Sequence, residues 1–174
     1  MSAVERLAQP VRVRAVAFDD AAAVALREAM VAEMRLRYWD RGRHGGTPVE
    51  AGEVVWTGVA FTGAGLPVGH ALVRRYPQEW LPPGAPQAVE LKRMYVVPAH
   101  RGTGVAGVLL VAAEAAGVAA GARHLLLHTG DRQPDAVRRY ERSGYRHVPV
   151  FPPYQEQDWS VCLAKVLPTN TALS

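Results

Sequence analysis

One stretch of the sequence constrains the fold more than any other. A strand pattern over 89–97, a glycine-rich turn, a helical pattern over about 103–120 and a second strand pattern over 124–129 follow one another. Two strands joined in this way through a helix become parallel neighbours by a right-handed crossover. The run Leu125–Leu127 indicates that the second strand is covered on both faces. The chain is therefore expected to form a sheet that contains a parallel pair and carries helices on both faces.

The patterns outside this unit extend the same sheet. We expect strands at 11–16, 54–61, 68–73, 145–150 and 159–166, and helices at 21–37 and 134–142. The turn Thr62–Gly65 predicts an antiparallel hairpin, and Asp19 or Asp20 is expected to cap the first helix. The order is β-α-β-β-β-α-β-α-β-β. It predicts an α/β class with an α+β mixed sheet that is mostly antiparallel.

Length and composition fit one domain. The chain has 174 residues, of which 49% are hydrophobic and 21% charged, enough to build a core. We expect a single domain over 1–174, with a core at about 11–166 and flexible ends at 1–10 and 168–174. The apolar run Val105–Ala113 ends at Glu114, well short of the ~20 residues that a membrane span needs.

The expected compartment is the cytoplasm. The N-terminus lacks the basic-then-apolar layout of a signal peptide. Cys162 is the only cysteine, so it cannot form an internal disulfide, and no Cys/His cluster has the spacing of a zinc site. We therefore expect a protein that acts without a metal and without a membrane.

The charge of the chain requires a separate explanation. Of 20 basic residues only Lys92 and Lys165 are lysines, the formal net charge is +4 and the pI is about 9.6. A basic pI is compatible with nucleic-acid binding. The arginines are dispersed, however, apart from Arg138, Arg139 and Arg142, and no helix-turn-helix or RNA-binding signature accompanies them. We expect no nucleic-acid partner; an anionic small molecule and a solvated surface are the alternatives.

The glycine-rich turn has two interpretations. Gly102–Gly107 matches G-x-G-x-x-G, which would predict a dinucleotide site. Four residues separate it from the strand, however, and too little chain follows for a second nucleotide-binding half. In the second interpretation Arg101-x-x-Gly104-x-Ala106 forms an anion cradle, because the unpaired N–H groups and the dipole at a helix start attract phosphate. Tight packing alone would also explain the glycines.

Two longer motifs decide between these interpretations. The segment 90–106 (ELKRMYVVPAHRGTGVA) resembles motif A of the GNAT N-acetyltransferase superfamily, and 136–145 (AVRRYERSGY) resembles its motif B. The predicted element order is also the GNAT order. The resemblance implies a GNAT fold whose sheet splays between the parallel strands at 89–97 and 124–129. It also implies transfer of an acetyl group from acetyl-CoA to a primary amine by direct attack.

The resemblance also implies which residues hold the co-substrate acetyl-CoA. Backbone groups of Met94, Tyr95 and Val96 would line the pantetheine, and the Val96 amide would polarise the thioester carbonyl. The diphosphate would be held by Arg101, Gly102, Thr103, Gly104, Val105 and Ala106. Gln133 stands where the family often has a CoA-contacting asparagine.

Three residues are candidates for proton transfer. Tyr140 matches the family tyrosine that protonates the departing thiolate; a core tyrosine is the structural alternative, with Ser143 or water in its role. Glu90 and His128 are alternative bases. Many GNAT enzymes use a carboxylate at the position of Glu90, which could instead pair with Lys92. His128 replaces the glutamate of the common form Leu-Glu-Thr-Gly, and its unperturbed pKa near 6.5 suits a base.

The acceptor is less defined. By the resemblance, Tyr38, Trp39, Asp40 and Tyr154 are expected to surround a small-molecule or peptide amine. A homodimer would be common for the superfamily. The main alternative function is a catalytically silent acyl-CoA-binding module that acts as a sensor or an interaction partner.

Overall fold

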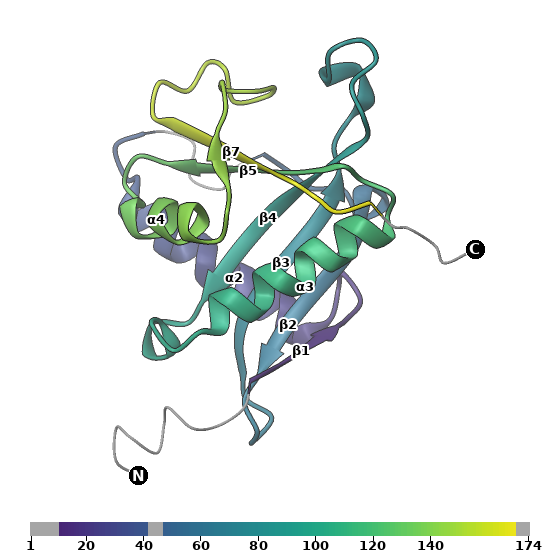
Figure 1. Ribbon diagram of the computed structural model, residues 1–174. Coiled ribbons are helices and arrows are strands. Elements are labelled where there is room, and N and C mark those ends of the chain that lie inside the picture. The colour runs from purple at the N-terminus through teal and green to yellow at the C-terminus, as the bar shows by residue number, and fades with distance from the viewer. Residues whose placement is uncertain (1–10, 42–46, 170–174) are drawn as a thin grey trace, which may run out of the picture.

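The computed structural model describes residues 11–41 and 47–169. Figure 1 shows one twisted sheet with helices on both faces. The strands are β1 (Arg12–Ala15), β2 (Val54–Phe61), β3 (Pro67–Arg75), β4 (Ala88–Val96), β5 (His124–Gly130), β6 (Arg146–His147) and β7 (Ser160–Val166). The helices are α2 (Ala21–Arg37), α3 (Val105–Ala119) and α4 (Pro134–Arg142), with short 3-10 turns at Ala51–Glu53, Gln78–Trp80 and Pro98–His100.

The predicted element order and fold class are confirmed. The strands lie in the order β1-β2-β3-β4-β5-β7-β6, and β4–β5 is the parallel pair, while the other neighbours are antiparallel. The parallel pairing runs from Ala88↔His124 to Leu91↔Leu127 and then stops, although both strands continue. The sheet is therefore splayed between β4 and β5.

A β-bulge in β4 coincides with the start of the splay. Leu72 of β3 pairs with Lys92, and His70 pairs with Tyr95, so β4 uses one residue more than β3 over this step. Arg93 adopts a left-handed φ of 56°, and its carbonyl lies 2.9 Å from His70 Nδ1. The bulge shifts the alternation of the strand, so that Tyr95 joins the α2 side of the sheet.

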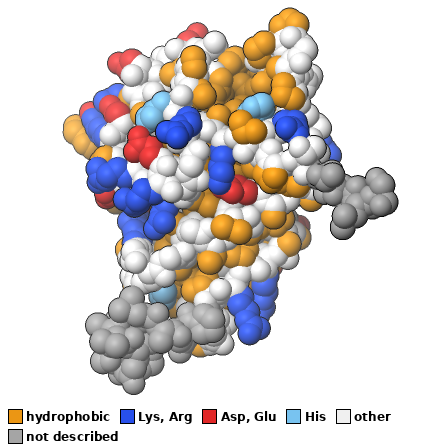
Figure 2. All heavy atoms as spheres, in the orientation of Figure 1, with side chains coloured by type: hydrophobic (Ala, Val, Ile, Leu, Met, Phe, Trp, Pro, Cys, Tyr) orange, Lys and Arg blue, Asp and Glu red, His pale blue; other side chains and the backbone are white. Residues whose placement is uncertain are grey.

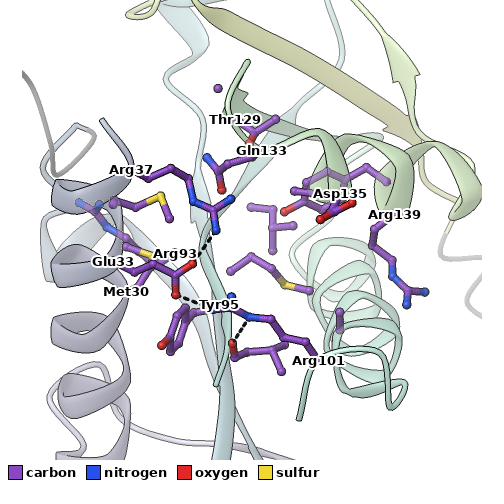
Figure 3. Close-up of a pocket in the computed structure, with 18 of the residues that line it drawn as sticks. Met30, Glu33, Arg37, Arg93, Tyr95, Arg101, Thr129, Gln133, Asp135 and Arg139 are labelled. Carbon is purple, nitrogen blue, oxygen red and sulfur yellow. Dashed lines mark hydrogen bonds and ion pairs between the residues drawn. The ribbon is translucent and has the colours of Figure 1, made fainter. Parts of the chain in front are cut away.

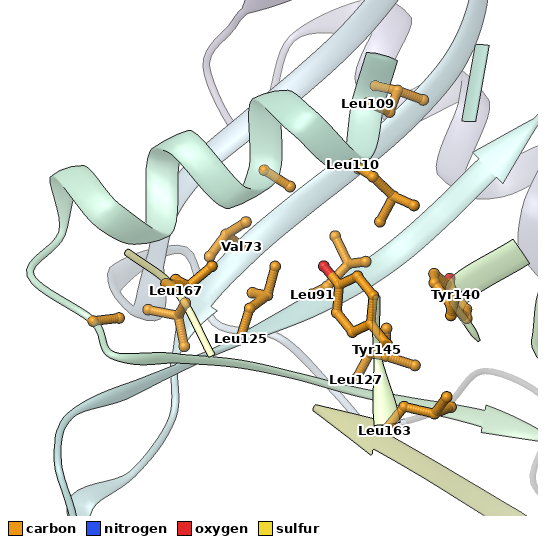
Figure 4. Close-up of a cluster of buried hydrophobic side chains, with 14 of the residues drawn as sticks. Val73, Leu91, Leu109, Leu110, Leu125, Leu127, Tyr140, Tyr145, Leu163 and Leu167 are labelled. Carbon is orange, nitrogen blue, oxygen red and sulfur yellow. The ribbon is translucent and has the colours of Figure 1, made fainter. Parts of the chain in front are cut away.

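Two hydrophobic layers hold the sheet. On one face α3 packs Leu109 and Leu110 against Val73, Leu91 and the centre of the sheet (Figure 4). On the other face α2 packs three buried residues, Ala23, Leu26 and Met30, against β2 and β4. Each fully buried leucine contributes about 2 kcal/mol from its apolar surface.

Several boundaries differ from the prediction by one to three residues, and two of the differences have a clear physical cause. Helix α3 begins at Val105 rather than near Thr103, because the left-handed Gly104 forms its N-cap (φ 93°). The strand predicted at 145–150 is reduced to β6, two residues long. Val148 still donates to the Cys162 carbonyl, but Pro149 has no N–H with which to extend the pairing.

Other expectations about the ends and surface have mixed outcomes. Asp20 caps α2, since its carboxylate accepts from the amides of Ala22 (2.9 Å) and Ala23 (3.1 Å). In the described ranges, no helix combines the length and apolar character needed to cross a membrane. The expected flexible ends fall largely outside the described residues.

Candidate active site

A cavity of about 570 Å³ occupies the splay between β4 and β5. It is walled by one stripe of α2, the second half of β4, the glycine-rich turn, the end of β5, and α4 (Figure 3). Its α2 wall consists of Met30, Glu33, Met34, Arg37 and Tyr38. The first four recur at positions i, i+3, i+4 and i+7, which places them on one side of the helix. The cavity therefore exists because the two parallel strands separate.

One end of the cavity is formed by backbone. Gly102 and Gly104 have positive φ values of 75° and 93°, and a Cβ at either position would meet open space. The amides of residues 102–106 donate no hydrogen bond to any described residue. These unpaired donors lie at the N-terminus of α3, where the helix dipole also favours an anion. This end of the cavity therefore fits a diphosphate.

Two residues expected at the phosphate contribute no side chain to the cavity. The Thr103 hydroxyl donates to the His100 carbonyl at 2.6 Å, and Thr103 is not part of the cavity lining. The Val105 side chain is buried in the core, which leaves only its backbone N–H for an anion. Gly107 lies inside α3 with open space at its Cβ position, so nothing in the fold requires the third glycine of the dinucleotide motif.

Glu33 links α2 to the glycine-rich turn and had no assigned role in the sequence. Its carboxylate pairs with Arg101 Nη2 at 2.5 Å and with Arg37 Nη2 at 2.8 Å (Figure 3). Arg101 Nε donates to the Val96 carbonyl at 3.0 Å. Burial opposes ionisation of Glu33, but Arg101 and Arg37 outweigh it and lower the pKa of this carboxyl. The Arg101 side chain thus points across the cavity towards α2.

The middle of the cavity exposes the edge of β4. Val97 donates its N–H to Val68 on β3. Because N–H groups alternate along a strand, the Val96 N–H points to the opposite side, towards the splay. Met94 and Val96 line the cavity there, and so does Tyr95. The three residues predicted to flank the pantetheine are brought together.

Tyr140 lies on α4 opposite this edge. Its ring lines the cavity and also packs on Tyr145, with ring centroids 5.8 Å apart. Its hydroxyl has no hydrogen-bond partner among the described residues. Burial raises the pKa of Tyr140, so the phenol holds its proton at neutral pH. A protonated phenol in this position can donate to a group in the cavity.

The far end of the cavity rests on a buried polar network, and Glu90 is its centre. The Glu90 side chain is fully buried and outside the cavity lining. Arg74 contacts its carboxylate through Nε (2.8 Å) and Nη2 (2.7 Å), and Tyr154 Oη donates to it at 2.5 Å. Lys92 Nζ lies 3.6 Å away. The structure therefore does not bring Glu90 to the cavity, because its oxygens are occupied from β3 and from the 151–158 segment.

His128 does line the cavity, but in an environment unsuited to a charged imidazole. Its ring stacks on Tyr154, with centroids 3.7 Å apart and planes 3° from parallel. Burial, followed by the charge of Lys92, lowers its pKa to about 3. Ser160 Oγ donates to the Tyr154 carbonyl (3.3 Å) and lies 2.9 Å from His128 Nε2. Both contacts are satisfied by the tautomer in which Nε2–H donates to Ser160 Oγ, and in that tautomer Nδ1 carries the lone pair.

The four residues expected around the acceptor are divided by the structure. Tyr38 is buried at the end of α2 and lines the cavity, where it packs on Trp159 at 5.1 Å. Tyr154 lies behind His128 in the polar network. Trp39 is 75% exposed, and Asp40 forms a bidentate pair with Arg132 (2.7 and 2.8 Å). Neither of these two is part of the cavity lining, because α2 ends at Arg37 and the chain turns outward.

Several lining residues were missed in the sequence. Among them are Lys92, Arg93, Thr129, Trp159 and the α4 arginines Arg138, Arg139 and Arg142. Figure 2 shows basic side chains gathered over α4. The spacing of Arg138, Arg139 and Arg142 on a helix was visible, but which face they occupy was not. The predicted Gln133 does line the cavity, with its amide 3.4 Å from Tyr38 Oη.

No group of three or more His, Cys, Asp or Glu in the described residues has the arrangement of a metal site.

Comparison with known proteins identifies the family of the chain. The sequence model of the Acetyltransferase (GNAT) family matches residues 16–145. A search of curated proteins finds no significant match.

Solved structures extend the likeness to nearly the whole chain. A candidate acyl-CoA N-acyltransferase of Klebsiella pneumoniae is 28% identical, with a TM-score of 0.71 over 91% of this chain and 98% of its own. A candidate N-acetyltransferase of Lactobacillus plantarum is 25% identical, with a TM-score of 0.62 over 92% and 99%. A GNAT-family acetyltransferase of Staphylococcus aureus, 11% identical, shares the fold at a TM-score of 0.66 over 91% and 100%.

The family match covers most of the chain, and it falls on the elements that build the cavity. GNAT proteins use acetyl-CoA or acyl-CoA as co-substrate, and the unpaired amides at the glycine-rich turn fit its diphosphate. The chain belongs to the GNAT acetyltransferase family.

Proposed function

We propose that the protein is an N-acetyltransferase that moves an acetyl group from acetyl-CoA to a primary amine by direct attack. One observation carries the proposal. A single cavity joins a row of unpaired amides at a helix start, an open strand edge and a buried phenol, in the order that CoA phosphates, pantetheine and thiol would require.

The CoA end is assigned to backbone and arginine. The amides of Gly102, Gly104 and Ala106 would hold the diphosphate, together with the N–H of Val105. Arg139 and Arg142 on α4 line the same cavity and form no ion pair within the described residues, so they are available to the remaining phosphate. Arg101 would exchange Glu33 for the diphosphate or bridge the two.

The reacting centre is assigned to β4 and α4. Acetyl-CoA supplies an activated acyl group whose carbonyl oxygen gains charge during attack. The Val96 N–H, which has no partner on β3, would donate to that oxygen. Tyr140 would give its proton to the departing sulfur, because burial keeps the phenol protonated until a strong base forms beside it.

The acceptor end is assigned to His128 and the rings around it. An amine must arrive neutral, because only its lone pair can attack. A nitrogen that is becoming an amide gives up its proton even to a weak base, so the unprotonated Nδ1 of His128 can accept it. Tyr38, Thr129 and Trp159 would form the walls of this pocket. Glu90 would act only from behind, through Tyr154.

A catalytically silent acyl-CoA-binding module remains the second candidate. It is favoured by one observation, namely that the two base candidates are a sequestered carboxylate and an imidazole whose pKa is lowered to about 3. The two candidates differ in turnover and share CoA binding.

The test has two readings. Saturation with acetyl-CoA at ~100 times its Kd should stabilise the protein by ~2.7 kcal/mol, measured as a rise in Tm. A panel of primary amines is then screened for CoA thiol release. A Tm rise with no release for any amine supports the silent module. No Tm rise at millimolar acetyl-CoA rejects both functions.

A further inference from the structure

Lys92 is a buried lysine beside the position proposed for the thioester. Its side chain is 8% exposed, and it lines the cavity together with Met94 and Val96 of the same strand. Met94 is two positions further along β4, so the two Cα atoms lie within roughly 7 Å. A lysine is almost never buried without a partner or a task. The contacts of Lys92 show which of these applies.

The Lys92 ammonium uses two of its three N–H groups for hydrogen bonds to described residues. Nζ donates to Thr47 Oγ1 at 2.7 Å and to Tyr154 Oη at 2.5 Å. Glu90 Oε1 lies 3.6 Å from Nζ, beyond hydrogen-bond distance. The third N–H therefore has only the longer ion pair with Glu90 among the described residues. Because Lys92 lines the cavity, a bound molecule can compete with that weak contact.

The charged groups around Lys92 act on it in opposite directions. Burial has the largest effect and lowers the pKa, the Glu90 carboxylate raises it, and Arg74 and Arg93 lower it again, to a pKa of about 8. The uncharged neighbours are Thr47, Tyr154 and His128. At pH 7 about one such amine in ten is neutral, roughly 200-fold more than for an ordinary lysine. Lys92 thus meets the chemical requirement for a nucleophile.

We propose that Lys92 is a site of self-acetylation, modified on Nζ by the acetyl-CoA bound in the same cavity when no external amine is present. The inference rests on the proposed function, since it needs the thioester beside β4. It goes beyond that function by naming an acceptor within the chain. The inference is supported by the position of a buried amine next to the β4 edge that is proposed to hold the acetyl group.

The step balances with groups already present. One proton leaves the Lys92 ammonium through Tyr154 Oη to Glu90 Oε1, along two hydrogen bonds of 2.5 Å. The free Nζ lone pair forms the C–N bond, and the C–S bond breaks with its electron pair on sulfur. Tyr140 protonates that sulfur and is reprotonated by the second proton that nitrogen loses. The first proton passes to solvent, and the products are acetyl-lysine and CoA thiol.

The surroundings tolerate loss of the lysine charge. Glu90 keeps both contacts with Arg74 and the hydrogen bond from Tyr154, so it is not left as an unpaired buried charge. The amide N–H that remains on Lys92 can still donate to Thr47 or Tyr154. An amide does not return its acyl group to an amine, so the modification is an end product.

The chain supplies its own reference site. Lys165 is the other lysine of the sequence. It pairs with Glu114 at 2.8 Å, is more exposed than Lys92 and is not part of the cavity lining. Free acetyl-CoA can reach Lys165 without entering the cavity, because this side chain is 28% exposed against 8% for Lys92. The ratio of the two sites therefore separates reaction within the cavity from reaction in solution.

The experiment incubates the full chain with acetyl-CoA alone and maps a mass gain of 42 Da by peptide mass spectrometry. We expect acetyl-lysine at position 92 in at least tenfold excess over position 165, with up to one CoA released per chain. Lys165→Arg should keep this signal, and Lys92→Arg should lose it. Equal acetylation of both lysines, or acetylation confined to another position, overturns the inference.

Two further measurements test whether acetylation of Lys92 takes place within the cavity. Tyr140→Phe should slow acetylation of Lys92 at least tenfold and leave that of Lys165 unchanged. The rate at Lys92 should rise roughly 20-fold from pH 6.5 to pH 8.5, because the neutral fraction of an amine with pKa about 8 rises by that factor. If acetyl-CoA stabilises the protein and external amines release thiol while Lys92 stays unmodified, the proposed function stands and this inference fails.

Discussion

The two ends of the cavity differ in the groups that form them, which are backbone amides at one end and side chains at the other. At the glycine-rich turn the donors are backbone amides of residues 102–106 that no described residue satisfies. At the acceptor end the polar groups are side chains. Tyr154 is hydrogen-bonded at 2.5 Å to both Glu90 and Lys92, and Glu90 also binds Arg74. The donors of the first end are free for an anion, whereas the groups of the second are bonded mainly to one another, and only Lys92 among them lines the cavity. The comparison predicts that mutations at the two ends will damage different properties.

The largest expected effect is at the acceptor end and on stability. Glu90→Gln should lower the free energy of unfolding by about 3 kcal/mol, because the buried Arg74 would keep only its 3.2 Å contact with the partly exposed Glu53 as a counter-charge. Urea denaturation measures the loss. Glu33→Gln at the other end is the matched variant and should cost at most about 1 kcal/mol, since its ion pairs are partly solvated. Equal losses at the two positions would refute the contrast.

Between the two ends, Tyr140→Phe should affect chemistry alone. Without the phenolic proton we expect kcat to fall about 100-fold or more, while the Kd of acetyl-CoA changes less than threefold. Tyr145→Phe is the control, because its hydroxyl bonds to Glu114 behind the cavity. A parallel loss of turnover and CoA affinity in Tyr140→Phe would make Tyr140 a structural residue.

Acid should unfold the protein through its buried histidines. Burial lowers the pKa of His128 to about 3 and that of His70 to about 4, so both stay neutral in the fold. The unfolded chain protonates them below about pH 6.5, and the free energy of unfolding therefore decreases as the pH falls from there. Each histidine contributes up to ~1.4 kcal/mol per pH unit.

The difference between variants isolates His128. His128→Gln should remove its share, so that from pH 6 to pH 4 the variant loses about 2 kcal/mol less than the wild type in urea titrations. His147→Gln, on the surface beside Glu141, should follow the wild type. Parallel curves for all three proteins would mean that the imidazole of His128 is solvated.

The smallest effects come from single glycines of the turn. Gly104→Ala should cost about 1 kcal/mol, because the residue has φ 93°, and it should also weaken CoA binding. Gly107→Ala, inside α3 with open space around its Cβ, should be neutral or stabilise by up to about 1 kcal/mol. Thermal unfolding distinguishes them. If Gly107→Ala lowered the stability as much as Gly104→Ala, the fold would require the third glycine of the motif after all.

What the sequence could predict follows from the same contrast. The order of elements and the glycine-rich turn are local patterns, so they were predictable, and so was the placement of Val96 and Tyr140. The burial and pairing of Glu90 could not be predicted, because they depend on the strand register that sets Arg74 of β3 opposite Glu90 of β4. For His128 the identity was visible, but the burial that lowers its pKa comes from Tyr154, which is distant in the chain.

Lys92 and Arg93 were missed for a related reason. Simple alternation assigns every second residue of β4 to one face, and the bulge at Arg93 breaks that rule within the strand. Trp39 and Asp40 were expected at the acceptor because they follow the first helix. Their exposure depends on where α2 stops and on the pairing of Asp40 with Arg132. Such contacts between distant segments are not encoded in any short pattern.

The bulge at Arg93 also bears on insertions and deletions. β4 carries one residue more than β3 between the pairs Leu72↔Lys92 and His70↔Tyr95. Deleting that residue would restore regular alternation, return Tyr95 to the other face and allow β4 to continue beside β5. The gap between β4 and β5 would then close, and the cavity would be lost. A one-codon deletion here would thus leave a sheet protein with nowhere to bind CoA, whereas deletions in the Pro82–Pro86 loop would leave the cavity intact.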